Sequence, residues 1–207
     1  MASALGVPLS LDLDGVALTY DDGPHPEGTP AVLEALRHGR AKAIFFLVGE
    51  RAEAYPALVQ EIVAEGHEPA VHGYRHRNQM RLSPGASAAD LDRAVATIAE
   101  ISGRHPSRYR PPYGVFTLPG LAGVRRRGLE PLLWSKWGRD WRRGQAPAQI
   151  ASRAARGLSP GDVILLHDAD WYSSPGCHRS TAAATPLILE EIARRGLSTV
   201  IPPEARA

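Results

Sequence analysis

The chain alternates short apolar segments with longer segments of helical periodicity, and this alternation limits the folds open to it. A glycine follows each helical stretch, where a left-handed residue usually ends a helix. The predicted strands are 15–20, 42–48, 68–72, 108–111, 129–134, 162–167 and 197–201. The predicted helices are 29–38, 55–65, 88–101, 118–127, 147–158 and 181–195. This pattern predicts an α/β fold with a parallel sheet covered by helices, in which the functional site lies at the carboxyl ends of the strands. Periodicity alone fits an irregular barrel and an open doubly wound sheet equally well.

Length and composition fit one compact domain. With 207 residues, of which 43% are hydrophobic, the chain can bury a substantial core, so we expect residues 1–207 to form a single domain. No segment approaches the ~18 apolar residues of a membrane span, and residues 1–14 lack the basic and apolar regions of a signal peptide. As written, the sequence therefore indicates a cytoplasmic protein. A net charge of +2 gives no basis for nucleic-acid binding.

Two adjacent carboxylates, Asp21 and Asp22, come directly after the first predicted strand and precede Gly23-Pro24. Neighbouring residues of a strand point to opposite faces, so both carboxylates serve one site only if the strand ends there and the backbone turns. Gly23 and Pro24 are typical turn residues. An ordinary exposed turn fits these four residues as well, and the interpretation depends on partners elsewhere in the chain.

Two histidines four positions apart, His72 and His76, follow the third predicted strand. On a helical turn, this spacing would place both imidazoles on one side, where they can bind one divalent metal ion. Exposed loop histidines are the alternative. Because Asp22 follows a neighbouring predicted strand, a site of two histidines and one aspartate with an open position for water is favoured.

Further polar and aromatic residues follow the later strands. The segment 110–114 contains two prolines that would fix Arg110 and the backbone near Tyr113. The segment 134–141 contains three of the four tryptophans, which fit core packing and sugar stacking equally well. The sixth predicted strand ends in His167, and the polar segment 168–181 after it has the position of a substrate-binding wall or lid.

These motifs, in this order, resemble those of the polysaccharide deacetylases of carbohydrate esterase family 4, the NodB-homology domain. The resemblance covers roughly residues 16–201. It rests on four matching segments and one altered segment: Thr19-Tyr20-Asp21-Asp22-Gly23-Pro24, His72 through His76, Arg110 to Tyr113, Leu165-Leu166-His167, and Trp137-Gly138-Arg139-Asp140-Trp141. In the last of these, Trp137 stands where the family often has an aspartate.

The resemblance implies a deformed (β/α)7 barrel with outer helices and an active site at the carboxyl ends of the strands. It implies that Asp22, His72 and His76 hold Zn²⁺ or another divalent ion such as Co²⁺, and that Asp21 is the general base. His167 would then be the general acid.

The remaining site residues have supporting roles in this hypothesis. Arg110 and Asp140 would orient the base and the acid. The backbone near Tyr113 would donate to the oxyanion, Leu165 would line a pocket for the acetyl methyl group, and Trp141 would contact the sugar.

The expected activity is removal of acetyl groups from N-acetylated amino sugars of a chitin-like or peptidoglycan-like glycan. The alternatives are an O-acetyl esterase acting on xylan or another glycan, and a glycan-binding module without turnover. The expected partner is an acetylated carbohydrate and the expected state is a monomer. Members of the family are often secreted or attached to the cell envelope, although this sequence shows no signal peptide.

Overall fold

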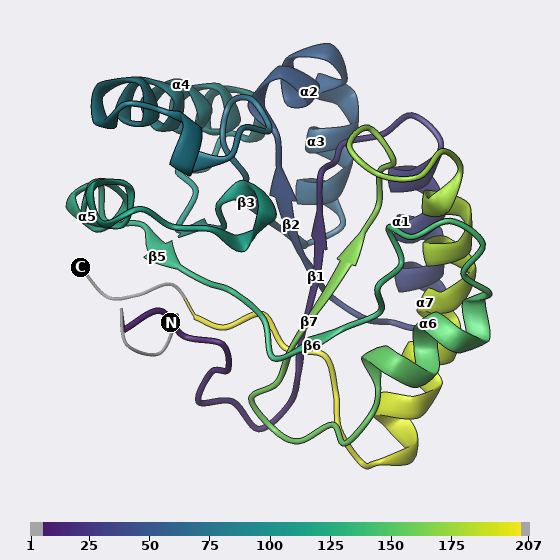
Figure 1. Ribbon diagram of the computed structural model, residues 1–207. Coiled ribbons are helices and arrows are strands. Elements are labelled where there is room, and N and C mark those ends of the chain that lie inside the picture. Colours follow the sequence, from purple (N-terminus) through teal and green to yellow (C-terminus); the bar gives the residue numbers. More distant parts are fainter. Residues whose placement is uncertain (1–5, 204–207) are drawn as a thin grey trace.

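The computed structural model describes residues 6–203, in which seven strands form one sheet in the order β5-β4-β3-β2-β1-β7-β6. Each strand is parallel to its neighbours. The strands are β1 (Ala17–Asp21), β2 (Ile44–Leu47), β3 (Glu68–Val71), β4 (Arg108–Tyr109), β5 (Glu130–Pro131), β6 (Lys136–Trp137) and β7 (Val163–His167). Helices surround the curved sheet, with α1, α6 and α7 on one side and α2 to α5 on the other (Figure 1). The predicted fold, a deformed seven-stranded α/β barrel with outer helices, is confirmed.

The helices match the predicted periodic segments and add short ones that the pattern did not predict. The α-helices are α1 (Gly28–His38), α2 (Gly49–Ala54), α3 (Pro56–Ala64), α4 (Pro84–Ser102), α5 (Leu118–Arg126), α6 (Pro147–Ala154) and α7 (Cys177–Arg194). Two 3₁₀ turns are η2 (Gln79–Arg81) and η3 (Pro112–Gly114). Helix α2 was missed because its six residues are too few to show a helical repeat.

One predicted strand, 197–201, was wrong. The structure has only an isolated parallel bridge there, between Val16 and Thr199. Pro202 and Pro203 follow at once, and prolines have no N–H with which to continue a ladder. The seventh strand is instead β6, which pairs with β7 inside the tryptophan-rich segment.

Five of the six helix-ending glycines have the expected left-handed backbone; Gly39 does not. They are Gly66, Gly103, Gly128, Gly157 and Gly196, with φ between 59° and 76°. Gly39 has a φ of −78°, and the left-handed residue after α1 is Arg40, with a φ of 50°. A Cβ on Gly39 would lie 2.4 Å from Cδ1 of Leu189, so that side chain would have to move to admit any other residue.

The two faces of β1 have different surroundings. Leu18 and Tyr20 belong to the large core between sheet and helices, whereas Ala17 packs with a smaller apolar cluster on the concave face. Since residues two apart share a face, Thr19 and Asp21 point into the concave side with Ala17. The small side chains of Ala17 and Thr19 leave room there for the buried polar group described below.

Within residues 6–203, no helix is long and apolar enough to cross a membrane. The prediction about a signal peptide concerned residues 1–14, of which residues 1–5 lie outside the described part of the chain.

His67 is a buried histidine that couples the stability of the fold to pH. Its side chain is 1% exposed, its Nδ1 accepts a hydrogen bond of 3.2 Å from the Ala43 N–H, and its Nε2 lies 3.8 Å from Glu65. Burial lowers the pKa of His67 to about 4, with Lys42 and Arg37 acting in the same direction and Glu65 opposing them.

We predict that stability falls as pH drops from 7 to 4.5. At pH 4.5 the unfolded chain, in which histidine has a pKa of about 6.5, binds a proton that folded His67 does not bind. This difference lowers the free energy of unfolding by about 2–3 kcal/mol. This contribution is complete above pH 6.5 and is lost toward pH 4. In His67→Asn, the amide oxygen can still accept from the Ala43 N–H but does not titrate. Urea unfolding at both pH values should show a fall about 2 kcal/mol smaller in the variant, and equal falls would contradict the assignment.

Candidate active site

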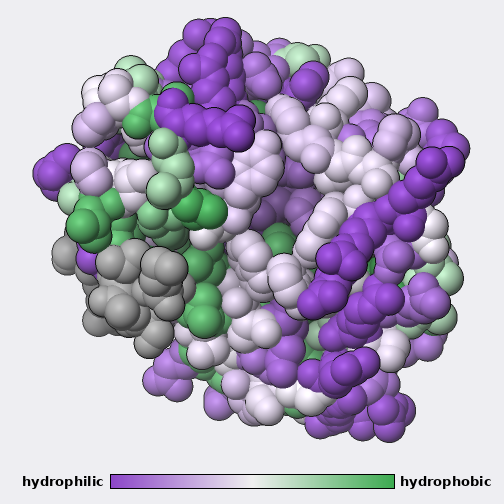
Figure 2. All heavy atoms as spheres, viewed as in Figure 1, coloured by the Kyte–Doolittle hydropathy of each residue, from purple (hydrophilic) through white to green (hydrophobic). Residues whose placement is uncertain are grey.

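A cavity of about 330 Å³ opens at the carboxyl ends of the strands. Figure 2 shows it as a hollow near the centre of the face in view, bordered by residues of intermediate hydropathy. Charged and aromatic side chains line it together: Asp21, Asp22, His72, His76, Tyr113, Gly114, Trp134, Trp137, Trp141, Leu165, His167, Tyr172 and Ser173. Eight of the ten residues predicted for the site therefore line one cavity, and Arg110 and Asp140 lie directly behind it.

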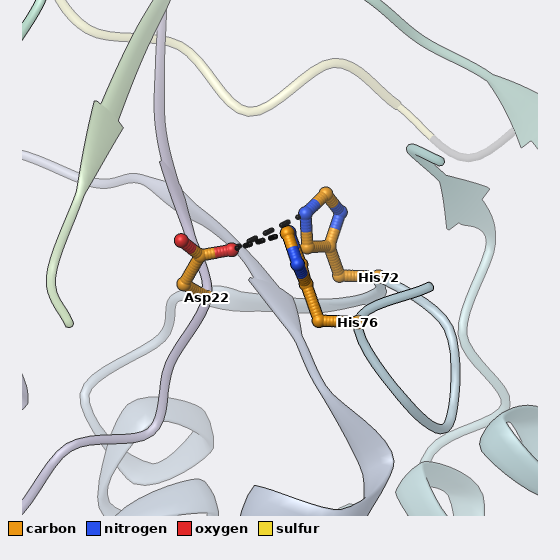
Figure 3. A group of neighbouring side chains, drawn as sticks. All are labelled: Asp22, His72 and His76. Atoms are coloured by element: carbon orange, nitrogen blue, oxygen red, sulfur yellow. Dashed lines mark ion pairs between the residues drawn. The ribbon is translucent and has the colours of Figure 1, made fainter. Parts of the chain in front are cut away.

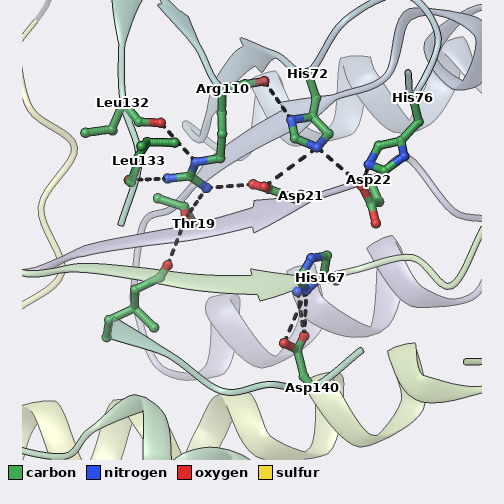
Figure 4. A network of polar contacts seen from close by, with 11 residues as sticks. Thr19, Asp21, Asp22, His72, His76, Arg110, Leu132, Leu133, Asp140 and His167 are labelled. Atoms are coloured by element: carbon green, nitrogen blue, oxygen red, sulfur yellow. Dashed lines mark hydrogen bonds and ion pairs between the residues drawn. The ribbon is translucent and has the colours of Figure 1, made fainter. Parts of the chain in front are cut away.

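Asp21 is held by a buried arginine. Arg110 Nη1 donates to Asp21 Oδ1 at 2.6 Å and to Thr19 Oγ1 at 2.8 Å. Its other nitrogens donate to the carbonyl oxygens of Leu132 and Leu133, at 3.1 and 2.9 Å, so each of the three guanidinium nitrogens has at least one acceptor (Figure 4). Arg110 is 0% exposed and Asp21 is 3% exposed. This network fixes one carboxylate oxygen and leaves the other, Oδ2, facing the cavity.

Asp22 reaches the same cavity because the backbone turns at that residue. Its φ is 77°, a left-handed conformation that costs a non-glycine residue about 1–2 kcal/mol. In an extended strand, Asp22 would point to the helix side, away from Asp21. The turn instead brings the second carboxylate beside the first, as the Gly23-Pro24 sequence led us to expect.

The side chains of Asp22, His72 and His76 converge on one point (Figure 3). Asp22 Oδ1 lies 3.4 Å from His72 Nε2 and 3.2 Å from His76 Nε2. The His72 Nδ1–H donates to the carbonyl of Arg110 at 2.8 Å, which leaves Nε2 with its lone pair toward Asp22. Asp22 Oδ1 is buried and has no hydrogen-bond partner among the described residues. Burial acts to raise the pKa of Asp22, but the two imidazoles hold it well below its usual range.

This donor set fits a divalent metal ion. A buried ionised carboxylate oxygen without a hydrogen bond, facing imidazole nitrogens, is an arrangement that a cation stabilises. Two imidazoles and one carboxylate, with the cavity open beside them, match the ligand set of a catalytic zinc site.

The segment between His72 and His76 is a loop, and the helical turn considered from the spacing was wrong. Gly73 has a φ of 85°, and its carbonyl accepts from the Gly49 N–H at the start of α2. The loop still brings both rings to the same side. Tyr172 stacks on His76 at 4.1 Å between ring centroids, which restricts the orientation of that imidazole.

His167 faces the cavity from the end of β7, directly beside Asp21 in the register of the sheet. Its Nδ1 lies 3.2 Å from Asp140 Oδ1, and its backbone N–H donates to Asp140 Oδ2 at 2.7 Å (Figure 4). Thr181 of α7 donates to the same oxygen at 2.9 Å. Burial alone would lower the pKa of His167, but the carboxylate of Asp140, together with Asp22 and Asp21, raises it to about 10.

Aromatic rings form one wall of the cavity. Trp141 lies edge-on to His167 at 5.4 Å, and Trp137 lies 5.4 Å from Trp141. Tyr113 also lines the cavity; it is 60% exposed, has a left-handed φ of 62°, and packs edge-to-face with His76. Leu165 lines the floor and is 3% exposed.

The loop predicted over 168–181 is shorter than expected, because α7 begins at Cys177. Tyr172 and Ser173, which are half-buried, line the cavity where a substrate-binding wall was predicted. Asp170 anchors this loop: its Oδ2 accepts from the Gly176 N–H at 2.6 Å.

A second group of metal-binding residue types, His25, Asp170 and His178, lies under this loop. His25 Nδ1 accepts the backbone N–H groups of Glu27 and Gly28, at 3.1 and 3.0 Å, so its ring proton resides on Nε2. That nitrogen faces Asp170 Oδ1 at 3.2 Å and has no lone pair to give a metal. His178 faces the other oxygen of Asp170 at 3.2 Å. The group therefore ties the loop to the starts of α1 and α7.

Two residues of the site, Thr19 and Thr181, had no role of their own in the sequence-based prediction. Trp134, Tyr172 and Ser173 were included only as parts of the segments 134–141 and 168–181. Thr19 could have been found from its spacing, since it lies two residues before Asp21 on the same face of the strand. The pattern of the sequence carried no signal for Thr181, because it lies in the first turns of a helix that was predicted to begin only there.

Comparison with known proteins gives one family. The family model described as polysaccharide deacetylase matches residues 11–132. The chain is 36% identical over 188 residues to a chitooligosaccharide deacetylase of Bradyrhizobium sp. (strain ANU 289), a match that covers 90% of this chain and 83% of the relative. It is 32% identical over 189 residues to a peptidoglycan-N-acetylglucosamine deacetylase of Bacillus cereus, covering 91% of this chain and 66% of the relative.

Among solved structures, the fold is similar to that of a family 4 carbohydrate esterase from Streptomyces lividans in complex with acetate. The TM-score is 0.82 at 31% identity, and the match covers 91% of this chain and 93% of the other.

We predict that His72→Ala and His76→Ala each lose a bound divalent ion, because each removes one of three donors around Asp22 Oδ1. Zinc content per chain, measured after gel filtration of zinc-loaded protein, should fall from about one to near zero. The control is His38→Ala, which changes a 76% exposed side chain at the end of α1 and should keep its zinc. Stoichiometric zinc in both site variants would disprove the site.

Proposed function

Because the chain belongs to the polysaccharide deacetylase family, we propose that it is a metal-dependent hydrolase that removes acetyl groups from N-acetylated amino sugars of a chitin-like or peptidoglycan-like glycan. One observation carries this proposal. The group of Asp22, His72 and His76 lies in a cavity with a carboxylate held by Arg110 on one side and an imidazole held by Asp140 on the other. A base, an acid and a metal site in one cavity are the parts that amide hydrolysis needs.

Asp22, His72 and His76 would hold the divalent ion, with Zn²⁺ or Co²⁺ as the candidates. When bound, such an ion supplies Lewis-acid activation of water and of the acetyl carbonyl. The unpartnered oxygen of Asp22 and the directed lone pair of His72 Nε2 support this assignment.

Asp21 would act as the general base. Its Oδ1 is occupied by Arg110, and its Oδ2 lies 3.8 Å from His72 Nε2, on the side of the cavity where the metal ligands converge. The buried guanidinium prevents this carboxylate from rotating. Oδ2 is thereby the atom that takes the proton of the attacking water.

His167 would act as the general acid. The carboxylate of Asp140 fixes the imidazole through Nδ1, so that Nε2–H is the group free to donate toward the departing amine. A pKa of about 10 keeps this imidazole protonated at neutral pH. Amides are harder to cleave than esters, because the departing amine must receive a proton before it can leave.

Three further groups would position the substrate. The backbone near Tyr113, held in its left-handed conformation, would donate to the oxyanion, a type of contact worth about 3 kcal/mol where it has been measured. Leu165, buried at the cavity floor, would contact the acetyl methyl group. Trp141, next to His167, would stack on the sugar ring.

The decisive variant is Asp21→Asn. The amide oxygen can still accept from Arg110, but the side chain cannot take a proton, so we expect kcat to fall about a hundred- to ten-thousand-fold while zinc content stays unchanged. Asp12→Asn, an exposed aspartate outside the cavity, is the control and should keep wild-type activity. Near wild-type turnover by Asp21→Asn would rule out this base.

The substrate class is tested by acetate release from N-acetylated chito-oligosaccharides and from acetylated xylan, each with and without a chelator. We expect faster, chelator-sensitive release from the N-acetylated oligosaccharides. Faster release from xylan would favour an O-acetyl esterase, and chito-oligosaccharide binding without any release would favour a non-catalytic binding module.

A further inference from the structure

A second hollow, which we call the basic subsite, adjoins the active-site cavity and has about the same volume, 330 Å³. Four of its six lining residues are cationic, and the six are Ser135, Lys136, Trp137, Arg139, Arg153 and Arg156. Trp137 lines both hollows, so the two adjoin at this residue. In Figure 2, a band of hydrophilic side chains runs beside the central hollow, over the region where Figure 1 draws the segment between β6 and α6.

The basic subsite has an excess of positive charge. No acidic residue lines it, and in the part of the chain that the structure describes Arg139 and Arg156 form no ion pair. Lys136 is only partly neutralised, by Asp162 at 3.6 Å, and Arg153 donates to the amide oxygen of Gln145. Cations that line one hollow repel one another, and an anion between them would relieve that repulsion.

The backbone holds Arg139 in place. This residue has a left-handed φ of 55°, which is unfavourable for a side chain with a Cβ. It lies between Gly138, where a Cβ would come within 2.6 Å of Ile150, and Asp140, which is fully buried against His167. The Arg139 guanidinium lies 4.9 Å over the Trp137 ring. A residue fixed in this way, with its charge unpaired, is better explained by recognition of a ligand than by solvation.

A line of rings leads from the reacting group to this charge. Trp141 contacts His167, Trp137 contacts Trp141, and Arg139 lies over Trp137. A glycan that stacks on Trp141 at the active site would place the next sugar beside Trp137, from where its substituents can reach Arg139 and Arg156.

We propose that the basic subsite binds a carboxylate carried by the sugar next to the one that loses its acetyl group. This inference rests on the proposed function and narrows its substrate class to carboxylate-bearing glycans. Arginine suits the task, because its planar group binds a carboxylate through two parallel hydrogen bonds. The carboxylate can come from a lactyl ether, as on N-acetylmuramic acid, or from a uronic acid.

The test compares kcat/KM for four oligosaccharides of equal length. One contains N-acetylglucosamine alone, one alternates it with N-acetylmuramic acid, one alternates it with glucuronic acid, and one is the methyl ester of the muramic oligosaccharide. The ester keeps the shape and removes the charge. We expect a carboxylate to raise kcat/KM about tenfold over the ester, and the lactyl and uronic arms identify the source.

Arg156→Gln and Arg139→Gln/Arg156→Gln should bring the acid-to-ester ratio close to one. Added salt should lower the wild-type ratio, because these charges are accessible to solvent. Arg126→Gln is the matched control: it removes the same charge from an exposed site at the end of α5, outside both hollows, and should leave the ratio unchanged.

Two results would overturn the inference: equal kcat/KM for acid and ester in the wild type, or a ratio that persists in the double variant. Failure of the proposed function appears differently, as absence of acetate release from all four compounds. In that case, calorimetric binding of the acid and the ester still tests the inference. The wild type should bind the acid about tenfold more tightly than the ester, whereas Arg156→Gln should bind the two equally.

Discussion

The site depends on the separation of two adjacent carboxylates at the end of β1. Asp21 continues the inward face of the strand, where it meets the buried Arg110. Asp22, turned by a φ of 77°, meets two imidazoles instead. An unpaired buried carboxylate is costly, and each of these would be strongly destabilising without its own cationic or hydrogen-bonding partners. The same backbone turn thus creates two different electrostatic environments within one residue of each other.

The parallel sheet supplies the rest of this arrangement. The register of β1 with β7 puts His167 beside Asp21, so the proposed base and acid are neighbours across one pair of strands. Arg110 follows β4 and reaches across the concave face because Ala17 and Thr19 leave space there. Asp140, fixed by Thr181 from α7, supports His167 from the opposite side. Partners from distant segments of the chain therefore converge because the carboxyl ends of parallel strands share an edge.

Much of this could be predicted from the sequence, because the signals are local. Alternating strands and helices predicted the parallel fold, and acidic or imidazole residues at strand ends predicted which side chains would meet. Strand pairing was harder: 197–201 has the apolar character of a strand, yet the prolines after it prevent a ladder, and β6 is only two residues long. The loop form of 72–76, the contribution of Thr181 and the tie between His25 and Asp170 depend on tertiary contacts, which no short-range pattern encodes.

The proposed chemistry requires that Asp22 binds the metal while Asp21 remains free to take a proton. Anomalous diffraction from crystals of the zinc-loaded protein, recorded on both sides of the zinc absorption edge, tests it directly. We expect one strong peak at about 2.0–2.2 Å from an Asp22 oxygen and from nitrogens of His72 and His76, with Asp21 still bound to Arg110. A peak ligated by Asp21, or zinc bound between His25 and His178 in place of this site, would contradict it.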